Sequence, residues 1–251
     1  AEVLAQHLNA QAEIHVFEQK PSAARKFLMA GKTGLNISHA EPVSLFVQRY
    51  DQVQWLSPLV QKWDAQWIQN WMQDLGIESY IGSSGRVFPI EMKAAPLLRA
   101  WLKRLIEHGV KFHYRHQILD LVENQLTILD QKNHQQFETK FDAIILACGA
   151  VSWSRLGSDG AWQKWLSPDA IERFQPSNAG VERKWSSYMQ AVFGQPLKRV
   201  DAWVGDQAKN QGDIVISHYG LESGLIYKQG RALRKLVKEN KPMVIYLDLL
   251  P

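Results

Sequence analysis

Small residues gather at two neighbouring places in this sequence, around residues 147–150 and again at 157–160. The first group ends a short apolar run, for which we predict a strand at Asp142–Ala147 that is buried on both faces. The second group, Gly157-Ser158-Asp159-Gly160, opens a helical pattern at Ala161–Leu166. A strand, a small-residue turn and a helix N-terminus together hold an anionic cofactor at the carboxyl edge of an open α/β sheet. Cofactor binding is therefore the leading hypothesis.

An acidic residue ends the first predicted strand, Glu13–Glu18, which follows what we interpret as the second half of a helix at residues 2–8. In dinucleotide-binding βαβ units, an acid about 20 residues after the glycine-rich turn accepts hydrogen bonds from the ribose hydroxyls. Glu18 fits that role if its glycine-rich turn precedes Ala1. The alternative is a solvated acid at the end of a strand.

Cations and glycines alternate over residues 25–36. Arg25 and Lys26 precede Gly31 and Gly34, and Asn36 tolerates a left-handed backbone. This pattern lets the main chain approach a pyrophosphate and a flat ring, while Arg25 or Lys26 supplies counter-charge. The alternative is a basic helix, capped by Ser22, that is followed by an ordinary loop.

Other reactive side chains are fewer. Cys148 is the single cysteine, which excludes a dithiol mechanism within this chain and leaves a small apolar filler as its ordinary role. His218 and Tyr219 could reach a substrate pocket as acid and hydrogen-bond donor, or could be aromatic residues of a turn. We find neither a metal-ligand spacing nor a nucleophile elbow, and the sequence assigns no catalytic acid.

The composition is that of a soluble globular protein: 251 residues, a net charge of +4 and a pI near 9.1. The charges are scattered, so the basic bias favours phosphate-bearing ligands and argues against nucleic acid as a partner. No apolar run is long enough to span a bilayer, and the lone cysteine fits a reducing cytoplasm. Both ends read as cut, and we expect an internal piece of a longer protein.

The elements that must position these residues follow from periodicity. We expect helices within Pro42–Leu75, with Pro42 at a first helical position, Asp64 as a cap, Gly76 as a stop and Trp63, Trp67 and Trp71 on one stripe. A second amphipathic helix is predicted at Ala94–His108, which Gly109 ends. Further predicted elements are short strands around 85–88 and at 110–114, 117–122, 125–129, 136–140, 213–217 and 243–247, and a helix at 230–239. This order matches a doubly wound sheet whose last crossover is a small antiparallel meander.

Six segments together resemble one known family. They are Arg25–Ser38, Gly85–Pro89, Leu146–Ala150, Ser152–Gly160, His218–Tyr227 and Leu247–Pro251. In this order along nearly the whole chain, they are similar to the BaiN-like NAD(P)/FAD-dependent oxidoreductases, which are glutathione-reductase-like flavoproteins. The resemblance implies an α/β fold: a Rossmann-like FAD-binding domain with a β-meander crossover, interrupted by helical additions and a second β-rich domain. We place the FAD-binding domain at 1–176, with a helical excursion at about 40–92, and part of the second domain at 177–251.

The resemblance also implies FAD as cofactor, with NADH or NADPH as the reductant, and roles for particular residues. Glu18 would bind the adenosine ribose, the segment from Lys26 to Asn36 would follow the pyrophosphate and flavin, and Ile118 would offer its backbone to the adenine. The implied cofactor-binding set is Glu18, Arg25, Lys26, Gly31, Gly34, Asn36, Ile118, Ala147, Cys148, Gly149, Gly157, Ser158, Asp159 and Gly160. The chain departs from the family in lacking the glycine-rich first turn, the C-terminal segment and a common threonine near Gly157. We therefore expect this piece alone to hold FAD weakly.

The functional hypothesis is an oxidoreductase that passes hydride from a reduced nicotinamide through FAD to a small organic acceptor, such as an activated double bond. The alternative is a flavin- or nucleotide-binding protein that acts through interactions without turnover. The sequence leaves the substrate, the choice between NADH and NADPH and the oligomeric state open.

Overall fold

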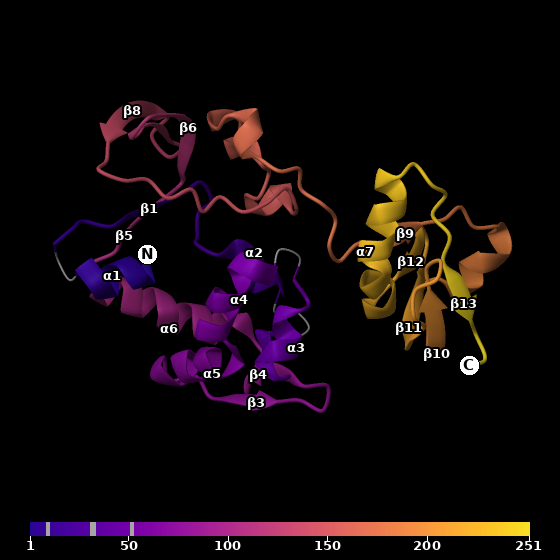
Figure 1. Ribbon diagram of the computed structural model, residues 1–251. Helices are drawn as coiled ribbons and strands as arrows, with labels where there is room; N and C mark the ends of the chain where they lie inside the picture. Colours follow the sequence, from indigo (N-terminus) through magenta and orange to yellow (C-terminus); the bar gives the residue numbers. More distant parts are fainter. Residues whose placement is uncertain (9–10, 31–33, 51–52) are drawn as a thin grey trace. The chain divides into compact units, whose positions relative to one another are not determined.

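The structure is a computed structural model, and it describes residues 1–8, 11–30, 34–50 and 53–251 (Figure 1). It divides into two compact units, Ala1–Ile171 and Glu172–Pro251. The elements of the first unit are α1 Glu2–Leu8, β1 His15–Glu18, α2 Arg25–Ala30, β2 Ser38–His39, α3 Val43–Val47, α4 Val53–Lys62, α5 Ala65–Asp74, β3 Ser79–Ile81, β4 Arg86–Pro89, α6 Ala94–Glu107, β5 Lys111–Tyr114, β6 His116–Val122, β7 Gln125–Asp130, β8 Gln135–Lys140 and the 3₁₀ helices η1 Ser154–Leu156, η2 Ala161–Trp165 and η3 Pro168–Ala170.

A parallel pair of strands, β1 and β5, lies at the centre of the first unit, with Glu18 opposite Tyr114 at its carboxyl end. The helices α1 and α6 cover one face of the pair, where Ala5, Leu105 and Val110 are buried. Parallel strands need a long crossover. Here the crossover is the whole segment from α2 to α6, which includes the helical excursion (Figure 1).

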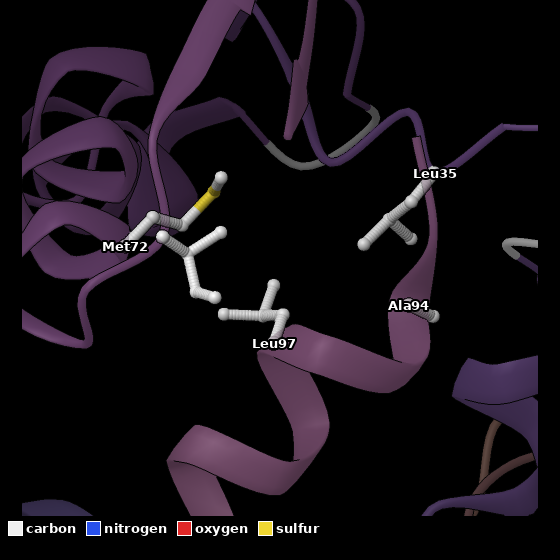
Figure 2. Close-up of a cluster of buried hydrophobic side chains, with 5 residues drawn as sticks. Leu35, Met72, Ala94 and Leu97 are labelled. Carbon is white, nitrogen blue, oxygen red and sulfur yellow. The ribbon is translucent and has the colours of Figure 1, made fainter. Parts of the chain in front are cut away.

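The excursion has its own core, formed by α5, α6 and the segment before β2. Met72 of α5 and Leu97 of α6 point toward one another and are fully buried (Figure 2). Leu35, Ile77 and Ala94 complete the cluster. The predicted helix at Ala94–His108 is confirmed as α6, because its apolar residues recur at helical spacing and bury one stripe.

The predicted helical region 42–75 consists of three helices. Asp64 caps α5 as expected, since its Oδ1 accepts from the Trp67 backbone N–H at 2.8 Å, and Gly76 follows the helix in a left-handed conformation (φ 74°). Two details are wrong. Pro42 is the residue before α3, where its extended ψ of 133° prevents it from being helical. Trp63 lies outside α5, because the Asp64 cap starts a new helix after it.

The cap that we predicted at Ser22 is also wrong. The helix α2 begins only at Arg25, and the Ser22 hydroxyl accepts a hydrogen bond from Arg25 Nη1 at 3.3 Å instead of from a backbone N–H of the helix. A bond to a side chain does not satisfy the first turn of a helix.

The four predicted strands between 110 and 140 are confirmed as β5 to β8. The last three form an antiparallel meander in the order β6-β7-β8. A polar turn after Asp130 joins β7 and β8 in a hairpin, and it closes because Asp130 Oδ1 accepts from the Lys132 backbone N–H at 2.8 Å. The expected meander is therefore observed, but no described strand of the parallel sheet follows it, so the predicted crossover within a doubly wound sheet is not formed.

The predicted buried strand at Asp142–Ala147 is wrong. Residues 142–147 form no strand and pair with no described strand, and Ile145 is 70% exposed. A strand needs a hydrogen-bonded neighbour, and the described parallel sheet contains only β1 and β5. The predicted helix at Ala161–Leu166 is also corrected: η2 is one short 3₁₀ helix, ended by the extended Leu166 two residues before Pro168.

The second unit is an antiparallel sheet in the order β13-β10-β11-β12-β9, with the helix α7 packed on it. Its core includes Val200, Ile214, Leu225 and Ile226. The element bounds are β9 Val181–Glu182, η4 Ser187–Val192, β10 Pro196–Trp203, β11 Asn210–Ser217, β12 Gly220–Glu222, α7 Gly224–Lys238 and β13 Tyr246–Asp248. The predicted strand at 213–217 lies within β11, and the predicted helix at 230–239 overlaps α7, which starts earlier than predicted. Of the predicted strand at 243–247, only residues 246 and 247 belong to β13.

Candidate functional site

The candidate site begins at the carboxyl end of β1, where Glu18 is half-buried beside Tyr114 of β5. One oxygen of Glu18, Oε1, accepts from the Lys20 backbone N–H at 2.8 Å, which fixes the carboxylate at the start of the next turn. Burial and the nearby charge of Glu18 raise the pKa of Tyr114. The phenol therefore stays protonated at neutral pH, and Glu18 is the anionic group at this end of the strand pair.

Residues 149–162 fold back on themselves into a compact loop. Gly149 is left-handed (φ 76°), and a Cβ there would lie 2.7 Å from Ser158 Oγ, so glycine suits the close approach of the two arms of this loop. Trp162 Nε1 donates to the Gly149 carbonyl at 2.8 Å, and Ser158 is only 7% exposed. The small residues predicted at both places in the sequence therefore come together in one loop.

This loop offers backbone donors without acceptors. Gly157 and Gly160 are left-handed, at φ 106° and 73°, while the N–H groups of Ser158, Asp159 and Gly160 have no acceptor within the described parts of the chain. Successive N–H groups in such a turn form a concave anion-binding nest. The Asp159 side chain bonds to the Ala161 N–H at 3.0 Å and closes the turn.

Two side-chain hydrogen bonds connect the loop to the end of β1 and to α2. Gln19 Nε2 donates to the Gly157 carbonyl at 3.1 Å, which places the loop beside the residue that follows Glu18. Lys26 Nζ of α2 donates to Ser152 Oγ at 2.8 Å. Sequence reasoning missed Gln19 and Ser152, because no local pattern marks a residue whose partner is more than a hundred positions away.

Cys148 lies among the negative groups of this site. Desolvation raises the pKa of its thiol most, and the charges of Asp159 and Glu18 raise it further. A thiol in this environment stays protonated at neutral pH and is a poor nucleophile. The structure thus places Cys148, Asp159 and Glu18 within electrostatic reach of one another. Cys148 itself is exposed, so the apolar filler expected from the sequence is wrong.

The other residues that the sequence predicted for the site belong to several different elements. Ile118 sits in β6 opposite Ile128, next to a bulge, and the indole of Trp165 reaches the Leu119 carbonyl at 3.4 Å. Gly34 and Asn36 flank Leu35, whose N–H bonds to the Met92 carbonyl at 2.9 Å, so this segment is attached to the excursion. Arg25 is half-buried and bonds to Ser22, Ala147 is exposed, and Gly31 lies outside the described residues.

In the second unit, His218 and Tyr219 form the exposed tip between β11 and β12. Their rings meet edge to face at 5.2 Å, and the Tyr219 hydroxyl donates to the Glu222 carboxylate, which raises the pKa of Tyr219. Of the described residues, no group of three His, Cys, Asp or Glu side chains could hold a metal ion, and no helix could cross a membrane.

Three histidines, His15, His113 and His116, cluster beside the central strand pair, and two of them stack. His15 Nδ1 and His113 Nε2 are 2.9 Å apart, the two rings are parallel, and Phe17 and His116 lie against His113. Burial lowers the pKa of His113 most, and the neighbouring charges of His15, His116 and Lys111 lower it further.

We therefore expect the first unit to lose stability as the pH falls. The folded-state pKa of His113 lies below its unfolded value of 6.5, so the unfolded chain binds the proton first. The stabilisation is complete above about pH 6.5 and is lost between that pH and the lower folded pKa. Urea unfolding at several pH values should show this slope, and His113→Gln, which keeps a donor near Nε2, should reduce it. Exposed His7→Gln is the control, and an unchanged slope in His113→Gln would contradict the assignment.

A parallel strand pair that ends in an acid, beside a glycine-lined loop of backbone donors, is the arrangement with which many α/β proteins bind nucleotides. Residues 3–191 match the family model described as HI0933-like protein Rossmann domain, and residues 175–251 match the HI0933-like protein barrel and H2TH domain. The chain belongs to the HI0933-like family of FAD-dependent oxidoreductases. The resemblance drawn from the motifs is thus confirmed for the family, and its Rossmann domain implies FAD binding.

A curated relative is the 3-dehydro-bile acid delta(4,6)-reductase of Clostridium scindens. It is 22% identical over 255 residues that include all of this chain and 61% of the relative's length. This chain therefore spans less than two thirds of that relative.

Proposed function

We propose that the protein containing this chain is an FAD-dependent oxidoreductase that takes hydride from NADH or NADPH and delivers it to a small organic acceptor with an activated double bond. Membership of the HI0933-like family supports FAD as the cofactor. The relative from Clostridium scindens is a delta(4,6)-reductase, and this activity supports an acceptor with an activated double bond. The single observation that carries the proposal is the turn at 157–160, whose N–H groups lack acceptors in the described residues and which Gln19, the residue after Glu18, holds through the Gly157 carbonyl.

The residues present fit FAD. Glu18 keeps one carboxylate oxygen, Oε2, without a partner in the described residues, and that oxygen is free for ribose hydroxyls. The N–H groups of Ser158, Asp159 and Gly160 suit anionic oxygens of the cofactor. Lys26 carries positive charge to the same loop through Ser152. When bound, FAD would supply the hydride-transfer chemistry.

The chain's own part is binding and positioning. Gly149 and Gly157 bring the main chain close, since a side chain at either would meet Ser158 or Gln19. Gln19 and Lys26 then hold the loop in register with the end of β1 and with α2. Arg25 would add counter-charge, and Ile118, Ala147 and Cys148 would flank the nucleotide.

The visible spectrum of the purified full-length protein tests this function. We expect the absorbance of bound flavin, and bleaching when NADH or NADPH is added without oxygen. A yellow protein that never bleaches would favour the flavin-binding protein without turnover. A colourless full-length protein that takes up no added FAD would overturn both.

A further inference from the structure

The excursion contains a cavity that the flavin site does not use. Its volume is about 310 Å³, within the range of small-molecule sites. It lies between the end of β2, α3, the N-terminal half of α5 and the end of β3. The lining residues are His39, Ala40, Glu41, Val43, Phe46, Asp64, Ala65, Gln66, Gln69 and Ile81.

The polar groups on one side of the cavity are already committed. His39 Nε2 lies 3.0 Å from the Ser84 carbonyl oxygen, and His39 Nδ1 lies 3.2 Å from the Glu41 backbone nitrogen, so both ring nitrogens already have partners. Both carboxylate oxygens of Glu41 accept from Arg49, through Nε and Nη2. This side therefore holds a neutralised pair and presents little charge to a ligand.

The α5 side keeps acceptors. Asp64 uses Oδ1 for the helix cap, while its second oxygen has no partner in the described residues. Gln66 and Gln69 donate through Nε2 to Asn70 and Ser79, at 2.9 and 3.3 Å, and their carbonyl oxygens are likewise without partners there. One carboxylate oxygen and two amide carbonyl oxygens of the lining residues are thus left for a ligand, beside an Arg49–Glu41 pair whose charges cancel.

The rest of the lining is apolar. Val43 and Phe46 are half-buried and Ile81 is 52% exposed, so each leaves surface that an apolar group could cover. A ligand that matches the whole cavity has several N–H donors and a positive charge at one end and an apolar body at the other.

We propose that this cavity binds a small primary ammonium ion with an apolar body, its ammonium group on Asp64, Gln66 and Gln69 and its body against Phe46 and Ile81. The inference is independent of the flavin site, because none of these residues belongs to it. The site is a ligand-binding site in the excursion, separate from the turn at 157–160.

Phenethylamine is the probe, titrated into the full-length protein labelled with ¹⁵N and followed by NMR. We expect binding near about 1 mM, as suits so small a ligand, with the largest shifts at residues of the cavity. The anion 3-phenylpropanoate, of similar size and opposite charge, should bind at least about tenfold more weakly.

The decisive variant is Asp64→Asn, because asparagine caps a helix as well as aspartate does and removes only the charge. It should weaken phenethylamine binding about tenfold. Asp74→Asn, at the other end of α5, is the control and should change nothing. Ile81→Thr, which keeps a β-branched residue in β3, should weaken the amine through its apolar body.

Three results would overturn the proposal: no shifts at the cavity up to about 10 mM amine, equal or tighter binding of phenylpropanoate, or unchanged affinity in Asp64→Asn. Bound flavin and its bleaching by NADH are read separately, so a failure here leaves the flavin result intact.

Discussion

Replacing Glu18 with alanine is expected to weaken FAD binding by the full-length protein by about 10- to 100-fold, because hydrogen bonds to a charged acceptor contribute about 1.5–3 kcal/mol each. The carboxylate lies at the carboxyl end of β1, beside Tyr114, with one oxygen held by the Lys20 N–H. No other acid in the described residues ends a strand of the parallel pair. The lost bonds would therefore have no local substitute.

The measurement is the dissociation constant of FAD, from fluorescence quenching during titration of the apoprotein. Glu107→Gln, an exposed acid at the end of α6, is the matched control. Thermal melting of the apoprotein shows whether Glu18→Ala still folds. Glu18→Gln keeps one acceptor oxygen, so its FAD dissociation constant should lie between those of Glu18→Ala and the unsubstituted protein. Equal FAD affinity in Glu18→Ala and the unsubstituted protein would remove Glu18 from the ribose.

Local patterns predicted the elements whose stability is mainly local. The helix α6 repeats apolar residues at helical spacing, and the hairpin after Asp130 closes through its own side chain. The Asp64 cap was also readable, because a capping residue acts on the N–H groups two and three positions later. Such features need little information from the rest of the fold.

The errors concern features that depend on distant partners. Residues 142–147 have the composition of a buried strand, and Ile145 is nevertheless exposed because no described strand lies beside it. Likewise, Trp63 continues the spacing of Trp67 and Trp71 but precedes Asp64, the residue that caps α5, and so lies outside that helix. Periodicity shows which secondary structure a segment could form. Whether a strand has a partner to pair with depends on the rest of the fold.

The candidate site divides in the same way. The small residues at 147–150 and 157–160 were visible in the sequence, since close main-chain contact requires them. Their connection to β1 and α2 was not, because it rests on Gln19 and Ser152, two residues that any loop could contain. Gly31 lies outside the described residues, so its place beside the pyrophosphate stays a prediction.

Replacing Gly220 with alanine should destabilise the second unit by at least about 3 kcal/mol, and lower its melting temperature by more than about 10 °C. Gly220 has φ 155° and pairs with Glu182 across β12 and β9. A Cβ there would lie 1.9 Å from the Val181 carbonyl oxygen and 2.9 Å from the Arg183 nitrogen. Both are backbone atoms, so β9 must separate from the sheet.

Gly205→Ala separates this clash from the cost of a positive φ. Gly205 has φ 56°, but a Cβ there would meet nothing within 4 Å, so its variant should lose only about 1 kcal/mol. Calorimetry of the two variants measures the difference, and hydrogen exchange at the amides of β9 and β12 reports where the structure opens. If Gly220→Ala melts no lower than Gly205→Ala, then β9 does not lie against Gly220.

Because this edge borders the tip that carries His218 and Tyr219, loss of β9 should also free the Arg183 N–H from the Tyr219 carbonyl, a bond of 2.8 Å. The variant thus links the stability of the sheet edge to the order of that exposed tip.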